Sequence, residues 1–518
     1  MGVHTPPGRR AFLKRAAALG GAAFLRPASG RGAAPSRFAS YPFTLGIASG
    51  APRPDGFVIW TRLAPDPLAG GGLDPFPVEV QWEVAHDAGF RRIAAKGNAI
   101  ARPERAHSVH VEVEGLEPQR EYHYRFMVGS DESGSGRACT APRAGAPARL
   151  KLAFASCQQY EQGFFVAHGH LADEGVDLIA FLGDYIYESS WGSRHVRKHG
   201  TPPPRTLAEY RNRYALYKAD AQLQKSHAAA PWIVTWDDHE VENDYANDRG
   251  ETLDSTFLAR RAAAYQAYLE HMPLRTSVMR EGGEMRLYGR HEWGALATLH
   301  LLDDRQYRSH QVCAKPNRGG SNVVGPQCTA RLDPTLTLLG TEQERWLDAG
   351  LGESKARWNL LVQQTLFATA ARVRENVRNY WTDGWDGYPA ARDRLVQSLV
   401  DRRAANPVIV GGDVHATYVA DVHARTDDLA SPIVATEFCG TSITSQGPNA
   451  KATDALRAAN PHIRYANGED RGYVVLDIRP DKLEARLRAV ATVKLEDAPV
   501  STRASFEVAA GRGGIARG

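Results

Sequence analysis

The sequence lacks an apolar run long enough to cross a membrane. A spanning helix needs about 20 apolar residues, and the mild apolar run over residues 16–25 is shorter than that. The sequence also lacks a basic stripe and a long block of like charge, which are the usual marks of nucleic-acid surfaces and charged tails. We therefore expect no stable membrane span and no specific nucleic-acid partner.

Cysteine is scarce, with five in 518 residues. Cys313 and Cys328 enclose a segment rich in Gly, Pro and Asn, and we expect a disulfide that staples this loop. Such a bridge contributes roughly 3 kcal/mol to stability at this loop length. An odd count leaves at least one thiol unpaired. Cys157 is the candidate, and the partners of Cys139 and Cys439 stay open.

The amino terminus has the three parts of an export signal. Residues 1–35 carry six Arg and Lys and no acid, and residues 8–14 read Gly-Arg-Arg-Ala-Phe-Leu-Lys before the apolar run. Paired arginines in this setting resemble a twin-arginine signal, although an ordinary secretory signal is the alternative. We expect export by the twin-arginine machinery to the periplasm or the medium. Without this segment, 57 basic and 59 acidic residues leave a net charge of about −2.

The length predicts two domains. Residues 43–143 read as all-β, with strands expected at 57–60, 78–84, 109–113 and 122–126. Residues 116–118 (Leu-Glu-Pro) precede a Tyr-x-Tyr strand, which is typical of the corner of an immunoglobulin or fibronectin III sandwich. Residues 129–147 are rich in Gly, Ser, Pro and Ala, so we expect a linker there. We expect the mature chain to be a monomer.

Residues 150–510 follow a different pattern. Apolar strands are expected at 150–155, 176–182, 231–236 and 407–412, and helical patterns such as 341–351 separate them. Alternating strands and helices predict a layered α/β domain. The expected organisation is therefore a signal peptide (1–35), a β-sandwich (43–143) and a catalytic α/β domain (150–510).

Polar side chains cluster directly after these four strands, at the sheet edge where ligands bind in α/β proteins. Each polar strand end alone is also usual for a turn, a helix cap or an inert buried thiol. Four such strand ends in one domain are not expected by chance. Converging carboxylates repel unless cations neutralise them, which predicts more than one metal ion. The set comprises Cys157, Asp184, Tyr187, Asp237, Asp238, His239, Asn243, Asp413 and His415.

Two metals about 4 Å apart can clamp a phosphoryl group and generate a hydroxide nucleophile. Asp184 is placed to bridge them, and Tyr187 lies three residues further on. A phenolate and a thiolate together favour Fe3+, whereas carboxylates and an amide favour a harder ion such as Ca2+. The residues thus predict a metal-dependent phosphoesterase.

Four motifs carry a resemblance to a known family. They are Phe-Ala-Ser-Cys-Gln at 154–158, Gly-Asp-Tyr-Ile-Tyr-Glu at 183–188, Trp-Asp-Asp-His-Glu-Val-Glu-Asn at 236–243 and Gly-Asp-Val-His at 412–415. Further matches lie at 304–308, 363–364, 381–389 and 437–445. In this order and spacing they resemble the alkaline phosphatase D family of metallophosphoesterases, from residue 43 to about 508.

The resemblance implies a four-layer α/β/β/α metallophosphoesterase sandwich preceded by an all-β immunoglobulin/fibronectin III-like domain. It also implies cleavage of phosphate monoesters and diesters with one iron and calcium. Asn243 is the least secure position, because Asp244 and Asn247 are alternatives. The implied iron ligands are Cys157, Asp184, Tyr187 and His415, and the implied calcium ligands are Asp184, Asp238, Asn243 and Asp413.

Two further residues are expected to act on the substrate. His239 is a candidate general acid or substrate-orienting group, and the alternative is that it only braces the carboxylates. Arg305 can offer a guanidinium fork to phosphate oxygens, and its alternative is a salt bridge with Asp303 or Asp304.

The sequence leaves two alternative functions open and excludes a third. A phosphodiesterase of phospholipase D type would use the same site, and an extracellular binding protein would carry its metals for structure. A zinc peptidase is excluded, because the His-Glu-x-x-His pattern that begins at His239 has Asn at position 243.

Overall fold

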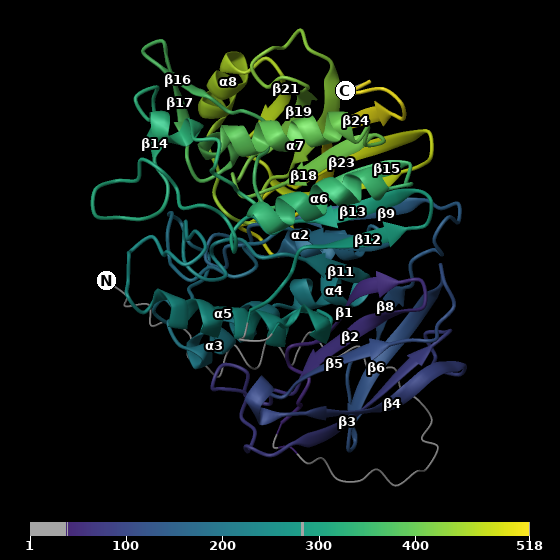
Figure 1. Ribbon diagram of the computed structural model, residues 1–518. Helices are drawn as coiled ribbons and strands as arrows, with labels where there is room; N and C mark the ends of the chain where they lie inside the picture. Colours follow the sequence, from purple (N-terminus) through teal and green to yellow (C-terminus); the bar gives the residue numbers. More distant parts are fainter. Residues whose placement is uncertain (1–37, 39, 281–283, 517–518) are drawn as a thin grey trace.

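The computed structural model describes residues 38, 40–280 and 284–516 (Figure 1). The predicted twin-arginine signal lies outside these residues. Among the described helices, none combines the length and the apolar character that a membrane crossing needs.

The N-terminal region is all-β and packs two layers of strands around one core. A tyrosine corner is present, because the Tyr122 hydroxyl accepts a hydrogen bond from the Glu117 amide at 2.9 Å. Phe57, Val84 and Phe126 are among the core residues between the layers. One layer holds β1 (Ile47–Arg53), β2 (Gly56–Arg62) and β5 (Ser108–Val113); the other holds β4 (Ile93–Ala101), β3 (Val78–Ala85), β6 (Glu121–Val128), β7 (Asp131–Glu132) and β8 (Gly136–Cys139).

Two features of this region differ from the sequence-based expectation. The segment 129–147 is not only a linker, because β8 pairs antiparallel with β6 and closes the second layer. In addition, β1 pairs in parallel with β11 (Pro231–Val234). The first layer therefore continues into the sheet of the following region, which alternating patterns along the chain do not reveal.

The larger region contains two mixed sheets packed face to face. The first has the order β24-β23-β22-β9-β10-β11-β1-β2-β5 and the second β12-β13-β15-β18-β20-β19-β21. Leu152, Leu360 and Phe438 belong to the core between them. The strands are β9 (Leu150–Ala155), β10 (Leu178–Phe181), β22 (Arg471–Ile478), β23 (Lys482–Val490) and β24 (Val500–Ala509), then β12 (Gly289–Trp293), β13 (Ala297–Leu301), β15 (Trp358–Val362), β18 (Pro407–Gly411), β19 (Thr417–His423), β20 (Ile433–Cys439) and β21 (Ile463–Asn467).

Helices cover the outer faces of both sheets and complete four layers (Figure 1). On the first sheet, α2 (Val166–Ala172), α3 (Leu207–Lys218), α4 (Ala221–Ala229) and α5 (Phe257–His271) enclose an aromatic-rich core. On the second, α6 (Thr341–Glu353) and α7 (Pro389–Asp401) do so. The remaining elements are α8 (Ala450–Ala459) and a small sheet of β14 (Val323–Val324), β17 (Val377–Trp381) and β16 (Arg372–Arg374). The predicted α/β/β/α sandwich with an all-β domain before it is confirmed.

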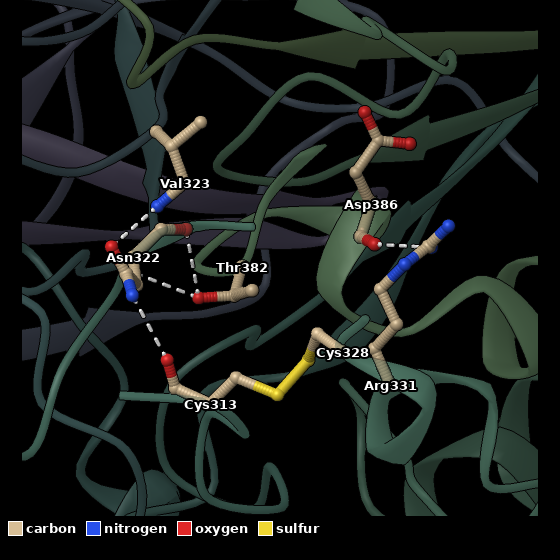
Figure 2. The surroundings of a disulfide bond; sticks show 7 residues. All are labelled: Cys313, Asn322, Val323, Cys328, Arg331, Thr382 and Asp386. Carbon is tan, nitrogen blue, oxygen red and sulfur yellow. Dashed lines mark hydrogen bonds between the residues drawn. A yellow bond between two sulfur atoms is a disulfide. The ribbon is translucent and has the colours of Figure 1, made fainter. Parts of the chain in front are cut away.

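The Cys313–Cys328 disulfide is formed as expected (Figure 2). It holds a loop that the Asn322 side chain also ties, by donating to the Cys313 carbonyl at 3.1 Å. The Asn322 amide in turn donates to Thr382 Oγ1 at 2.9 Å, so the stapled loop is fixed against the segment around Asp383. Cys139, Cys157 and Cys439 are free thiols.

Candidate metal centre

The strand ends that carry the predicted ligands share an unusual backbone conformation. Cys157 after β9, Asp184 after β10, and Asp413 and His415 after β18 have φ values of 59°, 57°, 66° and 53°. Residues with a Cβ rarely adopt positive φ, and each instance costs of order 1–3 kcal/mol. Such strain concentrates where a fold aims side chains at a functional site.

Gly183 shows how tightly these ends approach one another. Its φ is 100°, and an added Cβ would lie 2.5 Å from the Asp237 backbone nitrogen. Only glycine fits there, because any side chain would push the loops after β10 and β11 apart. Since β9, β10 and β11 are parallel neighbours, their carboxyl ends meet at one edge. The predicted side chains that follow these strands gather at that edge, and Asp413 and His415 come to it from the end of β18 in the second sheet.

The four predicted iron ligands lie together. Ligand atoms of Cys157, Asp184 and His415 are all within 4.8 Å of one another. The Tyr187 hydroxyl donates to Asp184 Oδ2 at 2.6 Å and lies 3.2 Å from His415 Nε2. Burial raises the pKa of the Cys157 thiol well above its usual value, and the Asp184 and Asp413 carboxylates raise it further. We call Cys157, Asp184, Tyr187 and His415 the first group. It needs a cation before its thiol can ionise.

Neighbouring groups hold His415 in one orientation. Its Nδ1 lies 3.0 Å from the Gln446 carbonyl oxygen. A carbonyl only accepts, so Nδ1 carries the proton and Nε2 keeps its lone pair facing Tyr187. The Trp191 ring stacks on the imidazole at 5.4 Å between centroids and an interplanar angle of 5°. The orientation is the one that a metal-ligating histidine requires.

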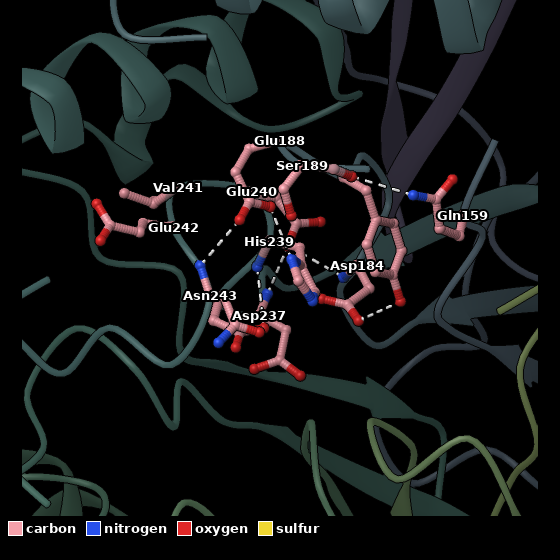
Figure 3. A network of polar contacts seen from close by, with 12 residues as sticks. Gln159, Asp184, Glu188, Ser189, Asp237, His239, Glu240, Val241, Glu242 and Asn243 are labelled. Atoms are coloured by element: carbon pink, nitrogen blue, oxygen red, sulfur yellow. Dashed lines mark hydrogen bonds and ion pairs between the residues drawn. The ribbon is translucent and has the colours of Figure 1, made fainter. Parts of the chain in front are cut away.

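Asp184 is shared between the first group and a second one. Ligand atoms of Asp184, Asp238 and His239 also lie within 4.8 Å of one another. Figure 3 shows Asp184, Asp237 and His239 converging. Asp184 Oδ1 is buried and has no hydrogen-bond partner among the described residues. Burial raises the pKa of Asp184 well above 3.8, and the Asp238, Asp237 and Glu240 carboxylates add to the rise, opposed by His239.

His239 is fixed by Glu188, a residue that the sequence reasoning quoted within a motif without giving it a role. The ring Nδ1 lies 2.7 Å from Glu188 Oε2 (Figure 3), and the ring packs on Tyr187 at 4.2 Å between centroids. Burial lowers the pKa of His239, but the carboxylates of Glu188, Asp238 and Asp184 outweigh it and hold the pKa well above 6.5. The imidazole is therefore able to hold a proton at neutral pH.

A third group contains Asp383, which the sequence reasoning did not choose, and Asp244, which it kept as an alternative to Asn243. Ligand atoms of Asp238, Asp244 and Asp383 lie within 4.8 Å of one another. Burial and the carboxylates of Asp383 and Asp238 raise the pKa of Asp244 to about 7. Asn243 lies beside this group, and its backbone N–H donates to Glu188 Oε1 at 3.2 Å. Asp383 lies within the matched segment 381–389, but it follows none of the four strands whose ends predicted the site.

Arg305 contacts the site through three of its carboxylates. Its guanidinium is buried and pairs with Asp237, with Asp383 at 2.7 Å and with Asp238 at 3.7 Å. The side chains of Asp303 and Asp304, the pairing alternatives expected from sequence, do not pair with it among the described contacts. Asp413 completes the edge, and its Oδ2 accepts a hydrogen bond from Thr365 Oγ1 at 2.6 Å.

An open cleft of about 610 Å³ leads to these groups. Its walls include His239, His415, Trp191 and Asn243. Both imidazoles therefore face the space from which a ligand would approach. Below, the edge that holds the three groups is called the carboxylate site.

Comparison with known proteins decides the family. A family model described as PhoD-like phosphatase matches residues 152–487, and the model of its N-terminal domain matches residues 29–142. The chain belongs to the PhoD-like phosphatase family. It is 46% identical over 515 residues to alkaline phosphatase D of Bacillus subtilis (strain 168), covering 96% of this chain and 87% of that protein. The prediction of a hydrolase of this type is confirmed.

Solved structures agree with this membership. A structure of PhoD superposes with a TM-score of 0.88 at 46% identity, covering 92% of each chain. The purple acid phosphatase PPD1 from yellow lupin (Lupinus luteus) seeds superposes with a TM-score of 0.56 at 11% identity, covering 91% of this chain and 74% of that one. The lupin enzyme shares the fold of the PhoD-like chain.

Proposed function

We propose that the chain is an exported, metal-dependent phosphatase that hydrolyses phosphate monoesters and diesters. The observation that carries the proposal is Asp184. Its Oδ1 is buried without a partner, and the residue belongs to both the first and the second group. A buried carboxylate oxygen without a donor costs free energy unless a cation meets it. The donor set therefore fits metal ions.

The ligand assignment follows from the groups. Cys157, Asp184, Tyr187 and His415 would hold Fe3+, since thiolate, phenolate and imidazole suit a transition metal. Asp184, Asp238, Asn243 and Asp413 would hold Ca2+, which prefers oxygen ligands. We add Asp244 and Asp383 as candidate calcium ligands, because they share the third group with Asp238. Bound there, the cations would withdraw electron density from the phosphoryl oxygens and lower the pKa of an attacking water.

The chain itself supplies a proton donor. His239 faces the cleft and is charged through Glu188, which holds its Nδ1 at 2.7 Å. We propose that the other ring nitrogen of His239, Nε2, protonates the leaving alkoxide. Arg305 is engaged by three carboxylates, so we propose that it positions Asp237 and Asp383. The phosphate contact predicted for Arg305 stays a prediction.

The cellular setting is part of the proposal. A disulfide supports a compartment outside the reducing cytoplasm, and the paired arginines at 9 and 10 support export by the twin-arginine machinery. The division into a signal (1–35), a β-sandwich (43–143) and a catalytic domain (150–510), and the monomeric state, stay proposals as well.

The test is turnover of p-nitrophenyl phosphate and bis-p-nitrophenyl phosphate by the purified protein, with calcium and after chelation. We expect turnover of both esters with calcium and loss of both after chelation. Diester turnover alone would favour the dedicated phosphodiesterase. No turnover of either ester under any metal condition would overturn the proposal and favour an extracellular binding protein whose metals are structural.

A further inference from the structure

A second cleft, of about 410 Å³, lies at the junction between the N-terminal β region and the α/β sandwich. The end of β1, the segment 273–278 and strand β12 line it. In Figure 1, β12 lies beside β11 above β1. Its described lining shares no residue with the cleft of the carboxylate site. The volume is within the range of ligand pockets, which are frequent at domain junctions.

Arginine dominates the charge of this second cleft, which we call the arginine cleft. Five arginines line it, and Glu292 is the one carboxylate among its described lining residues; the arginines are Arg53, Arg275, Arg280, Arg286 and Arg290. Like charges that converge in a partly enclosed space repel one another. The side chains that line the cleft therefore carry an excess of positive charge.

The pairing of these arginines leaves donors free. Among the described contacts, the guanidinium groups of Arg53 and Arg280 have no hydrogen bond or ion pair. That of Arg286 packs over the Tyr288 ring at 4.2 Å and lies 5.9 Å from the centre of the Trp346 ring. Arg275 pairs with Glu112 at 2.8 Å, yet its Nε is buried without a partner. Arg290 pairs with Glu353 at 3.2 Å, and its Nε is likewise buried and unpartnered. A buried donor without a partner is unfavourable, and an acceptor that enters the cleft would relieve that cost.

His291 lies close enough to these arginines for their charge to affect its pKa. It lines the arginine cleft. Burial, followed by the charges of Arg275 and Arg53, lowers its pKa to about 4. The ring is therefore neutral at physiological pH. A neutral imidazole can donate one hydrogen bond to an oxyanion.

Guanidinium groups offer planar pairs of N–H donors that match phosphate oxygens. We propose that the arginine cleft binds a phosphate-bearing anion, at a site separate from the carboxylate site. The anion is either free orthophosphate or one phosphate of a chain that carries several. This proposal does not depend on the hydrolytic function, since it concerns equilibrium binding alone.

The test is isothermal titration of the purified protein with inorganic phosphate and with tripolyphosphate, without added calcium. The variant Arg53→Gln/Arg286→Gln removes two of the guanidinium groups that pair with no carboxylate among the described residues. The control Arg91→Gln/Arg457→Gln removes the same charge from exposed positions outside the cleft. We expect the cleft variant, and not the control, to lose about tenfold or more in affinity at one site.

The two probes distinguish the source of the anion. A loss for inorganic phosphate assigns the site to free phosphate, and a loss confined to tripolyphosphate assigns it to a phosphate chain; both support the proposal. Ser277→Glu, which places a negative charge on an exposed wall residue while every arginine stays, should weaken the same binding step if the double variant folds poorly. Equal stoichiometry and affinity in wild type, control and both cleft variants for both probes would overturn the proposal.

Discussion

Two buried charged regions of this PhoD-like phosphatase differ in how their carboxylates are balanced. Glu270 of α5 pairs with Arg211 of α3 at 2.6 Å, and Glu242 in the loop after β11 pairs with Arg260 of α5 at 2.5 Å. We call these four residues the ion-pair belt. In the carboxylate site, by contrast, Asp184 and Asp413 form no ion pair with Lys or Arg among the described residues.

The difference separates structure from function. A buried ion pair supplies its own counter-charge, so breaking it leaves an uncompensated charge and costs stability. A buried carboxylate without a basic partner gains its counter-charge from outside the chain. The belt should therefore respond to mutation through stability, and the carboxylate site through activity and metal content.

The largest expected effect is on activity. Asp184→Asn keeps the shape of the side chain but removes its charge and one acceptor oxygen. We expect a loss of roughly a thousandfold, about 4 kcal/mol of barrier, in turnover of p-nitrophenyl phosphate. The stability of the metal-free variant should not fall, since an unneutralised carboxylate is gone. If the variant keeps more than about a tenth of wild-type activity, Asp184 is not the shared ligand.

The ion-pair belt should show the opposite response. Glu270→Gln leaves the guanidinium of Arg211 without its carboxylate, and we expect the free energy of unfolding in urea to fall by about 3 kcal/mol. Asp413→Asn in metal-free protein is the matched control, with an expected change near zero or a gain. Equal destabilisation by the two variants would remove the distinction between the regions.

The third effect is a dependence of stability on pH. In the metal-free chain, burial, followed by neighbouring carboxylates, raises the pKa of Asp244 and of Asp304 to about 7. The unfolded values are near 4, so the folded chain holds these protons more tightly. Their stabilisation is complete below about pH 4 and is lost as pH rises through 7, by up to about 1.4 kcal/mol per unit for each group. A flat unfolding profile between pH 4 and 8 would contradict the raised values.

The smallest expected effect separates two neighbours. Asp244→Asn should weaken the apparent calcium affinity by about tenfold, which is the usual effect of losing a ligand or its support. Asn243→Ala should weaken it less, because Asn243 lies outside the third group. The measurement is the calcium concentration that restores half of the activity after chelation. The reverse order would make Asn243 the stronger calcium ligand of the two.

Much of the fold could be predicted from the sequence. Apolar strands bounded by turn residues marked β9, β10, β11 and β18, and the tyrosine corner marked the β-sandwich. The pairing of β1 with β11 could not be predicted, because it joins two regions with different local patterns. The strand β8 was missed because Gly, Ser and Ala around it read as a linker.

The candidate site divides in the same way. Cys157 and Asp184 follow neighbouring parallel strands of the first sheet, so the topology brings them to one edge. Asp413 follows β18 of the second sheet and reaches them because the two sheets pack face to face. Asp383 follows no strand of the two main sheets and reaches Asp238 through a stapled loop and Arg305. Glu188 was quoted in a motif, but its hydrogen bond to His239 depends on the path of two loops. Contacts of this kind require the tertiary structure.

The central claim is that metal cations, and not lysine or arginine side chains, balance Asp184 and Asp413 of the carboxylate site. Elemental analysis of the fully active protein, with its visible absorption spectrum, tests this most directly. We predict at least one iron and one calcium per chain and a charge-transfer band from thiolate or phenolate bound to Fe3+. The content of both metals per chain should be lower in Asp184→Asn. A colourless protein that is fully active without iron or calcium would contradict the account.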